Sequence, residues 1–275
     1  MRVMLATPTL RQEPTASFLM CVMKTMNLLA QHGIALDTCF VGGDSFIAKA
    51  RNGLVQSFIE TWTSEYPADV LFFVDDDQGW DEQAVLRAVL DSHEIIAAAV
   101  PKKMDAQPGD PQTFNNVMLD TTDAGECYVE NGMLRATQIG SGFMLIKRTA
   151  IEKMIAAYPQ RYAPGDGGLH ALHYNLFDAK VIWDAKDDTV TGQFWGEDLI
   201  FCQKWGALGG KIWVDPNVTM EHIGRKSWTG NFLEFLQKHA SVQVSQPVPP
   251  ANVVPLAAAP APIQETLDAI ERIAA

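Results

Sequence analysis

Apolar residues in the first hundred positions alternate between two spacings. The apolar run from Val3 to Ala6 predicts a strand, and apolar residues from Phe18 to Leu29 then recur at helical spacing until Gly33. The same pair of patterns continues, and it predicts strands over residues 34–41, 70–74 and 95–100 and helices over 47–62 and 81–92. Such alternation is typical of βαβ units. We therefore expect an α/β fold with a mainly parallel central sheet.

The second half of the chain is less regular. Residues 104–135 are polar and contain prolines and glycines without a sustained period, so we expect loops with a short hairpin. The pattern then predicts a strand over 138–147 that carries Gly140-Ser141-Gly142, helices over 149–157 and 197–208, and a strand over 211–214.

The C-terminal stretch has a different composition. Proline recurs among alanine and valine between Gln243 and Gln264, which favours an extended linker. Ile263, Leu267 and Ile270 follow at i, i+4 and i+7 and predict an amphipathic helix too short to be stable alone. The expected organisation is one domain over 1–240, a Pro/Ala-rich linker over 241–262, and a helix over 263–275. That helix would dock on its own domain, on a second copy in a homodimer, or on another partner.

The amino-acid composition limits which cellular compartment and which binding partners we expect. The formal net charge of -12 gives no general attraction to nucleic acid or anionic lipid, although a local basic patch would still allow it. The 4 cysteines are far apart and include no CxxC pair, which argues against a disulfide framework and a structural zinc. No apolar run approaches the ~18 residues of a spanning helix, and the first strand is too short for the core of a signal peptide. We expect a cytoplasmic protein without a membrane span.

Three adjacent carboxylates, Asp75-Asp76-Asp77, directly follow the apolar run Val70 to Val74. Adjacent carboxylates repel one another unless a cation or hydrogen-bond donors compensate, and ligands of open α/β sheets bind at the carboxyl ends of the strands. Oxygen ligands of this kind suit Mg²⁺ or Mn²⁺. The alternative is an acidic turn that caps the helix beginning near Asp81.

Other charged residues stand at unusual positions. Arg51 lies on the apolar face of its predicted helix, so we expect it to meet either an internal carboxylate or a bound phosphate. Glu197 and Asp198 begin a helix, where acidic residues are common for dipole reasons but where a carboxylate could also deprotonate a hydroxyl group. His222 is a candidate third metal ligand, or an ordinary surface or core histidine.

Taken in chain order, these motifs resemble the GT-A fold of nucleotide-sugar glycosyltransferases. The motifs are Ala50-Arg51-Asn52, Phe72-Phe73-Val74-Asp75-Asp76-Asp77, Gly140-Ser141-Gly142-Phe143, Gly196-Glu197-Asp198 and Glu221-His222-Ile223-Gly224. The run from Gly209 to Pro216, followed by His222, is similar to family-2-like enzymes of bacteria and their bacteriophages. The resemblance covers about residues 1–235 and implies a single GT-A (Rossmann-like) domain that acts in a bacterial or phage-infected cytoplasm.

The resemblance also implies a role for each matching residue. Asp75-Asp76-Asp77 matches the DxD motif, with Asp77 and Asp75 as ligands of Mn²⁺ or Mg²⁺ and His222 as the C-terminal metal-binding histidine. The implied donor-binding residues are Thr7 and Pro8 in a loop after the first strand, Arg51, Asp75, Asp76 and Lys102. The implied acceptor-side residues are Gly140, Ser141, Gly142 and Trp195. Glu197 and Asp198 match the catalytic acidic pair, whose Asp is the base in inverting members.

The function expected from these features is metal-dependent transfer of a sugar, from a nucleotide-sugar donor such as a UDP-sugar, to an acceptor hydroxyl. The acceptor is open: a hydroxymethylated pyrimidine in phage DNA, a glycan, a protein side chain or a small molecule. Lys102, Lys103, Arg225 and Lys226 would contact the diphosphate or an anionic acceptor, or are simply solvated. Two alternatives are a sugar nucleotidylyltransferase, although Thr7 to Leu10 lack the glycine-rich phosphate loop, and a non-catalytic nucleotide-sugar or glycan binding module.

Overall fold

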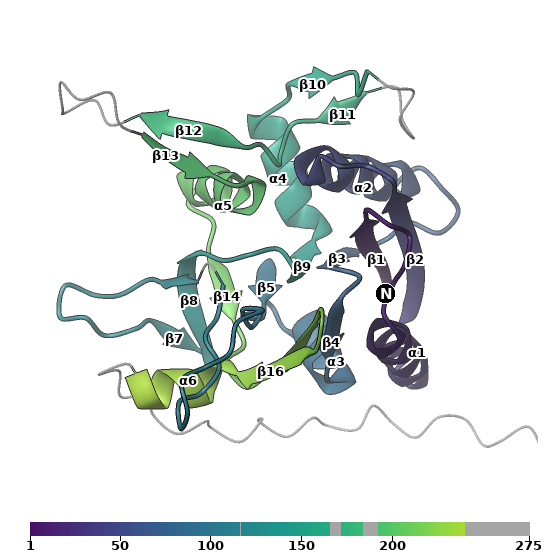
Figure 1. The fold of residues 1–275 in the computed structure, drawn as a ribbon. Coiled ribbons are helices and arrows are strands. Elements are labelled where there is room, and N and C mark those ends of the chain that lie inside the picture. Colours follow the sequence, from purple (N-terminus) through teal and green to yellow (C-terminus); the bar gives the residue numbers. More distant parts are fainter. Residues whose placement is uncertain (116, 166–171, 184–191, 240–275) are drawn as a thin grey trace, which may run out of the picture. The chain divides into compact units, whose positions relative to one another are not determined.

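The computed structural model describes residues 1–115, 117–165, 172–183 and 192–239, all within one compact unit, Met1–Val244. A central sheet lies between two layers of helices (Figure 1). The helices are α1 (Ala16–Gln31), α2 (Ile47–Thr61), α3 (Glu82–Leu90), α4 (Arg148–Ala157), α5 (Glu197–Ala207) and α6 (Phe232–His239). The expected linker and C-terminal helix lie outside the described residues. Within the described ranges, no helix combines the length and apolar character needed to cross a membrane.

The central sheet is mainly parallel, as the sequence predicts. Its strand order is β2-β1-β3-β9-β5-β14-β8-β6, with β7 paired to β8. The strands are β1 (Arg2–Thr9), β2 (Ala35–Gly42), β3 (Val70–Val74), β5 (Ile95–Ala97), β6 (Met118–Leu119), β7 (Val129–Glu130), β8 (Met133–Gln138), β9 (Phe143–Lys147) and β14 (Ile212–Val214). Because β9 is antiparallel to both β3 and β5, the strands β2, β1, β3, β5 and β14 all run in the same direction.

Alternate residues of the buried strands face two separate hydrophobic cores. In β3, Leu71 and Phe73 pack in the core shared with α2, α4 and α5, whereas Val70, Phe72 and Val74 pack in the core shared with α1 and α3. Successive side chains of a strand point to opposite faces of the sheet. The continuous apolar run of β3 is therefore explained by helices on both faces, as predicted for a central strand.

Two sequence expectations about strand boundaries are wrong. The first strand does not end at Ala6, because β1 remains paired with β2 as far as Thr9, so Thr7 and Pro8 lie in a strand and not in a loop. Pro8 is tolerated there because β3 pairs with β1 only as far as Ala6, which leaves the end of β1 open on that side. The expected strand over 138–147 is interrupted, because β8 ends at Gln138, β9 begins at Phe143, and Gly140-Ser141-Gly142 lies in the connection between them.

A small second sheet was not predicted. It consists of β4 (Gln78–Trp80), β15 (Thr219–Ile223) and β16 (Ser227–Asn231), in the order β16-β15-β4. Its register places His222 opposite Gln78, and the backbone N–H of Ile223 donates to the carbonyl of Asp77 at 2.8 Å. The small sheet thereby places His222 at the end of β3. The remaining strands form two hairpins, β10 (Arg161–Tyr162) with β11 (His173–Tyr174) and β12 (Lys180–Trp183) with β13 (Gly192–Trp195).

Candidate active site

A cavity of about 390 Å³ collects most of the predicted site residues at the carboxyl end of β3. We call it the site cavity, and it is lined by Ile47, Arg51, Asp75, Gln78, Val100, Asn115, Gly140, Ser141, Gly142, Glu197, Asp198 and His222. These residues come from α2, from the end of β3 and the start of β4, from the segment between β5 and β6, from the connection between β8 and β9, from the start of α5 and from β15. The position agrees with the general location of ligand sites in open α/β sheets.

Other predicted residues do not line the site cavity in the described structure. Thr7 and Pro8 are buried in β1, and Trp195 lines a different cavity together with Thr137 and Cys202. The backbone carbonyl of Asp76 accepts from Thr15 N at 2.9 Å. The residues predicted here and found outside the lining are Thr7, Pro8, Asp76, Asp77, Lys102 and Trp195.

Arg51 connects the two acidic parts of the cavity. Its side chain is 4% exposed, its Nη2 donates to Asp75 Oδ1 at 2.8 Å, and its Nε donates to Glu197 Oε1 at 3.2 Å. The guanidinium also stands 5.3 Å from the centre of the Phe73 ring. Burial opposes the charge, but the two carboxylates raise the pKa of Arg51. The expected anionic partner of Arg51 is thus an internal carboxylate pair.

Glycines allow the carboxylates to approach the backbone closely. A Cβ on Gly142 would lie 3.1 Å from Asp75 Oδ2, and the carbonyl of Gly142 accepts from Asp75 N at 3.2 Å. A Cβ on Gly140 would lie 3.5 Å from Asp198 Oδ2. The glycines on either side of Ser141 therefore place both acidic residues against one short connection.

Asp77 lies between two potential cations. Lys103 Nζ forms an ion pair with Asp77 Oδ2, and His222 Nε2 lies 3.5 Å from the same oxygen. Burial alone would raise the pKa of Asp77, but His222 and Lys103 hold it down at about 2. His222 Nδ1 lies 2.7 Å from the carbonyl oxygen of Pro101. Asp77 is therefore an anion at neutral pH.

Asp198 has the opposite electrostatic environment. Burial and the neighbouring charge of Glu197 raise the pKa of Asp198, against smaller effects of Leu199 N and Arg51. Leu199 N donates to Asp198 Oδ1 at 2.8 Å, and the other carboxylate oxygen faces Gly140. Glu197 is paired with Arg51, whereas the pKa of Asp198 is raised above its ordinary value. The two members of the acidic pair are therefore not equivalent.

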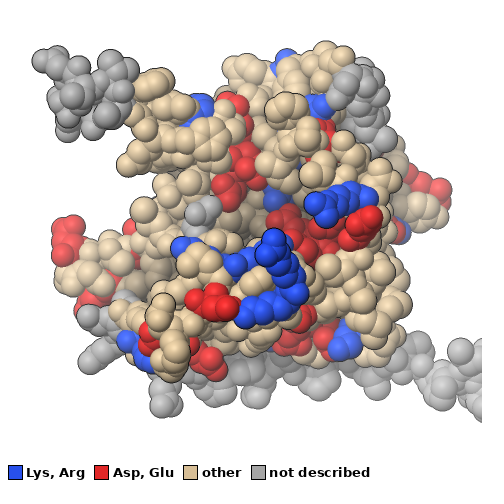
Figure 2. Space-filling model, viewed as in Figure 1, with Lys and Arg blue, Asp and Glu red and all other residues tan. Residues whose placement is uncertain are grey.

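The charges on the outer side of the site are mixed. Figure 2 shows Lys and Arg side chains beside Asp and Glu side chains near the middle of one face. Lys103 pairs with Asp77, and Lys226 pairs with Asp105. Within the part of the chain that the structure describes, no three His, Cys, Asp or Glu side chains form a group able to hold a metal ion.

The sequence analysis missed several residues that line the site cavity. Gln78 directly follows the three aspartates, so its position next to a candidate ligand set was a usable signal. Asn115 lies in the polar stretch without periodicity, where nothing in the sequence indicated a site. Ile47, the first residue of α2, and Val100, in the segment after β5, are ordinary apolar residues, and only the tertiary structure identifies them as part of the lining.

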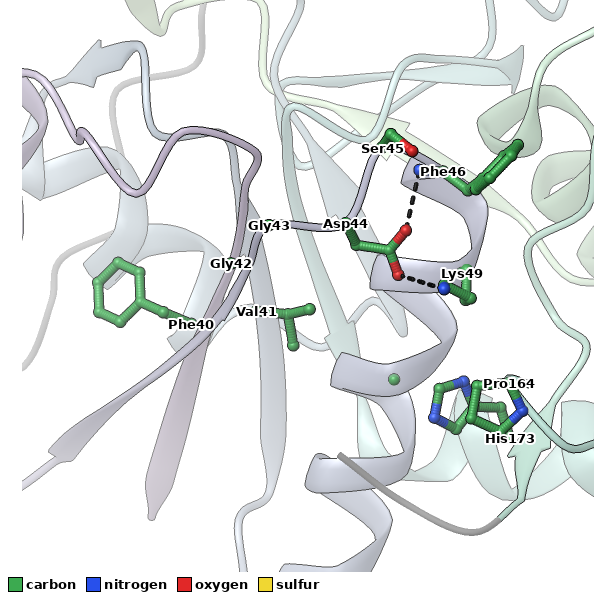
Figure 3. A pocket seen from close by; sticks show the side chains of 11 residues that line it. Phe40, Val41, Gly42, Gly43, Asp44, Ser45, Phe46, Lys49, Pro164 and His173 are labelled. Atoms are coloured by element: carbon green, nitrogen blue, oxygen red, sulfur yellow. Dashed lines mark hydrogen bonds and ion pairs between the residues drawn. The ribbon is translucent and has the colours of Figure 1, made fainter. Parts of the chain in front are cut away.

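A second cavity of about 400 Å³ lies at the end of β2 and the start of α2 (Figure 3). Its lining includes Phe40, Phe46 and His173 and contains none of the predicted residues. Asp44 accepts from Phe46 N at 2.9 Å and pairs with Lys49 at 3.2 Å. The acidic and basic side chains of this cavity therefore already bind each other.

Comparisons with known proteins give only distant similarities. No protein-family model and no curated protein sequence matches the chain. The crystal structure of A197 from STIV is 16% identical over 84% of this chain and 95% of that chain, with a TM-score of 0.46. The catalytic domain of Drosophila beta1,4galactosyltransferase 7 is 12% identical over 84% and 71%, with a TM-score of 0.42. S. aureus TarS 1-349 is 11% identical over 78% and 58%, with a TM-score of 0.38.

Proposed function

We propose that this chain is a metal-dependent glycosyltransferase with a GT-A fold, which moves a sugar from a nucleotide-sugar donor, such as a UDP-sugar, to an acceptor hydroxyl. The observation that carries the proposal is the site cavity itself. One cavity at the carboxyl end of the sheet contains Asp75, which follows β3, and Asp198, a carboxylate with a raised pKa. Arg51 lies between the two acidic parts.

The residues around Asp77 fit a divalent cation, Mn²⁺ or Mg²⁺. Because the carbonyl of Pro101 can only accept, His222 Nδ1 is the ring nitrogen that donates, and neutral His222 has its free electron pair on Nε2. Nε2 and Asp77 Oδ2 face each other at 3.5 Å, so a cation between them would take the place of the proton through which His222 lowers the pKa of Asp77. Hard divalent cations often take few protein ligands and complete their shell with substrate phosphates. Asp77 and His222 would hold the cation, and Asp75 stays a predicted ligand.

When bound, such a cation supplies Lewis-acid stabilisation of the departing nucleoside diphosphate. Lys103, which pairs with Asp77, would contribute a second positive charge to the diphosphate. Asp198 accepts the proton of the acceptor hydroxyl as that oxygen attacks the anomeric carbon. Glu197, bound to Arg51, fixes the start of α5 and is therefore a positioning residue in this scheme.

The experiment is incubation of the full chain with Mn²⁺ and a panel of nucleotide sugars, with and without EDTA. Metal-dependent release of the nucleoside diphosphate, either by slow hydrolysis or on addition of an acceptor, supports the proposal. The acceptor arms are hydroxymethylated DNA, an oligosaccharide and a peptide. Donor cleavage only in the presence of pyrophosphate would instead identify a nucleotidylyltransferase, and binding without turnover would identify a binding module.

A further inference from the structure

Three buried polar side chains of the site cavity each retain one atom without a hydrogen-bond partner among the described residues. They are Arg51, which is 3% exposed, Gln78, 1%, and Ser141, 2%. The unpartnered atoms are Arg51 Nη1, Gln78 Oε1 and Ser141 Oγ. Buried polar groups of native proteins are nearly always hydrogen-bonded, because an unpaired one costs stability. Three such atoms in one cavity indicate a ligand that completes them.

The hydrogen-bonding direction of each atom is determined. Arg51 Nη1 can only donate. Gln78 Nε2 donates to Asp77 Oδ1 at 3.0 Å, and because a carboxylate only accepts, the amide orientation is fixed and Oε1 is left as an acceptor. The hydroxyl of Ser141 can both donate and accept. The ligand must therefore accept from Arg51, donate to Gln78 and form a bond of either kind with Ser141.

The charges of the lining exclude most ligand classes. An anionic group would meet the amide oxygen of Gln78 and the carboxylates of Asp75, Glu197 and Asp198. A cationic group has only hydrogens to offer, so it cannot accept from Arg51 Nη1. A neutral hydroxyl group accepts and donates at the same time, so it satisfies each of the three atoms. The cavity, at about 390 Å³, falls in the range of small-molecule sites.

We propose that Arg51, Gln78 and Ser141 bind the free hydroxyl groups of the transferred sugar, and that the site takes a neutral sugar and rejects one that carries a carboxylate. This inference rests on the proposed glycosyltransferase function and adds the chemical class of the sugar. The resemblance assigns Ser141 to the acceptor side, whereas here it serves the donor sugar. Ser141 lies between Gly140, which is next to Asp198, and Gly142, which is next to Asp75. A sugar bound to Ser141 would therefore lie between Asp198, the proposed base, and Asp75, the predicted donor-binding residue.

The test measures dissociation constants of UDP, UDP-glucose, UDP-galactose and UDP-glucuronate by calorimetry on the full chain with Mn²⁺. The variants are Gln78→Leu and Ser141→Ala. The matched control is Gln56→Leu in α2, since Gln56 is also buried, also has an unpartnered Oε1 and also donates through Nε2 to a carboxylate, Glu60, at 3.4 Å. Gln56 is not part of the site cavity.

We expect the wild type to bind a neutral UDP-sugar more tightly than UDP, and UDP-glucuronate at least about tenfold more weakly than that neutral sugar. Ser141→Ala should lose about tenfold in affinity for the neutral UDP-sugar and change its affinity for UDP by less than about twofold. Gln78→Leu also removes the hydrogen bond to Asp77, so it should weaken UDP as well, but should weaken the neutral UDP-sugar about tenfold more than UDP. Gln56→Leu should bind all four ligands as the wild type does. If Gln78→Leu does not fold, Ser141→Ala carries the test.

Two results would overturn the inference and leave the proposed function standing. One is equal or tighter binding of UDP-glucuronate than of the neutral UDP-sugars. The other is binding of neutral UDP-sugars that neither variant weakens. If UDP and all three UDP-sugars fail to bind the wild type in Mn²⁺, then the proposed donor chemistry fails and the sugar preference fails with it.

Discussion

The two acidic regions of the site have the same side-chain chemistry and opposite electrostatics. At the end of β3, Lys103 and His222 lower the pKa of Asp77 to about 2. At the start of α5, burial and the charge of Glu197 raise the pKa of Asp198. The difference arises from the charged neighbours, since both groups are aspartates with the same ordinary pKa and burial raises the pKa of both.

This contrast divides the work of the proposed reaction. A carboxylate that remains ionised suits a cation ligand, and a carboxylate with increased proton affinity suits a general base. Arg51 separates the two roles, because it pairs with Asp75 on one side and with Glu197 on the other and leaves Asp198 without an ion-pair partner among the described residues.

The largest expected effect is the loss of the base. Asp198→Asn should lower kcat by about a thousandfold, because proton removal by a positioned group is worth that much, while donor affinity stays within about threefold. Steady-state kinetics and donor titration measure the two quantities. The control is Asp37→Asn, because Asp37 is an exposed carboxylate that pairs with Arg2. This variant should leave kcat and donor affinity unchanged. Near-normal turnover of Asp198→Asn would remove Asp198 as the base.

The next effect is structural and concerns the residue between the two regions. Arg51→Gln leaves the carboxylates of Asp75 and Glu197 without their cation, which should lower the free energy of unfolding by about 3 kcal/mol. Urea unfolding measures this change. The control is Arg148→Gln, whose exposed i, i+4 pair with Glu152 is worth less than about 0.5 kcal/mol. Equal losses for the two variants would show that Arg51 does not hold the regions together.

Removing the cation ligand should produce a smaller change than removing the base. Asp77→Ala should weaken Mn²⁺-dependent donor binding by about 100-fold and leave binding in EDTA unchanged. Calorimetry with and without Mn²⁺ separates the Mn²⁺-dependent donor affinity from the Mn²⁺-independent one, and a circular dichroism spectrum checks the fold. Unchanged donor affinity in Mn²⁺ would contradict the ligand role of Asp77.

The smallest effect is the pH dependence of stability, which has opposite signs in the two regions. The folded-state pKa of Asp77 is lowered from 3.8 to about 2, so its contribution of about 2 kcal/mol is present above pH 3.8 and is lost as the pH falls toward 2. The pKa of Asp198 is raised, so its contribution is present below pH 3.8 and is lost as the pH rises through the folded-state value.

Urea unfolding between pH 6 and about pH 2.5 tests these signs. Asp77→Asn should lose less stability on acidification than the wild type, and Asp198→Asn should lose more. The same direction of change in both variants would contradict the division between the two regions.

Much of the fold and part of the site could be predicted from the chain alone. The apolar run of β3 is short, continuous and β-branched at both ends, so its strand and the position of Asp75 after it were evident. The connection at Gly140-Ser141-Gly142 was misread as strand, because apolar residues flank it on both sides and glycine is compatible with either interpretation. The small sheet was missed because β4 has only three residues and its partners are more than a hundred positions away.

The mainly parallel α/β fold, the burial of Arg51 and the acidic residues at the end of β3 and the start of α5 could all be predicted from the order of residues along the chain. Periodicity along the chain reports which face of an element is buried, and these features depend on that information. The interaction partners became visible only in the folded chain. Arg51 binds Asp75 and Glu197, which are 24 and 146 positions away, and β15 brings His222 to Asp77. Such contacts follow from strand order and register, which depend on packing between distant segments and leave no local pattern in the sequence.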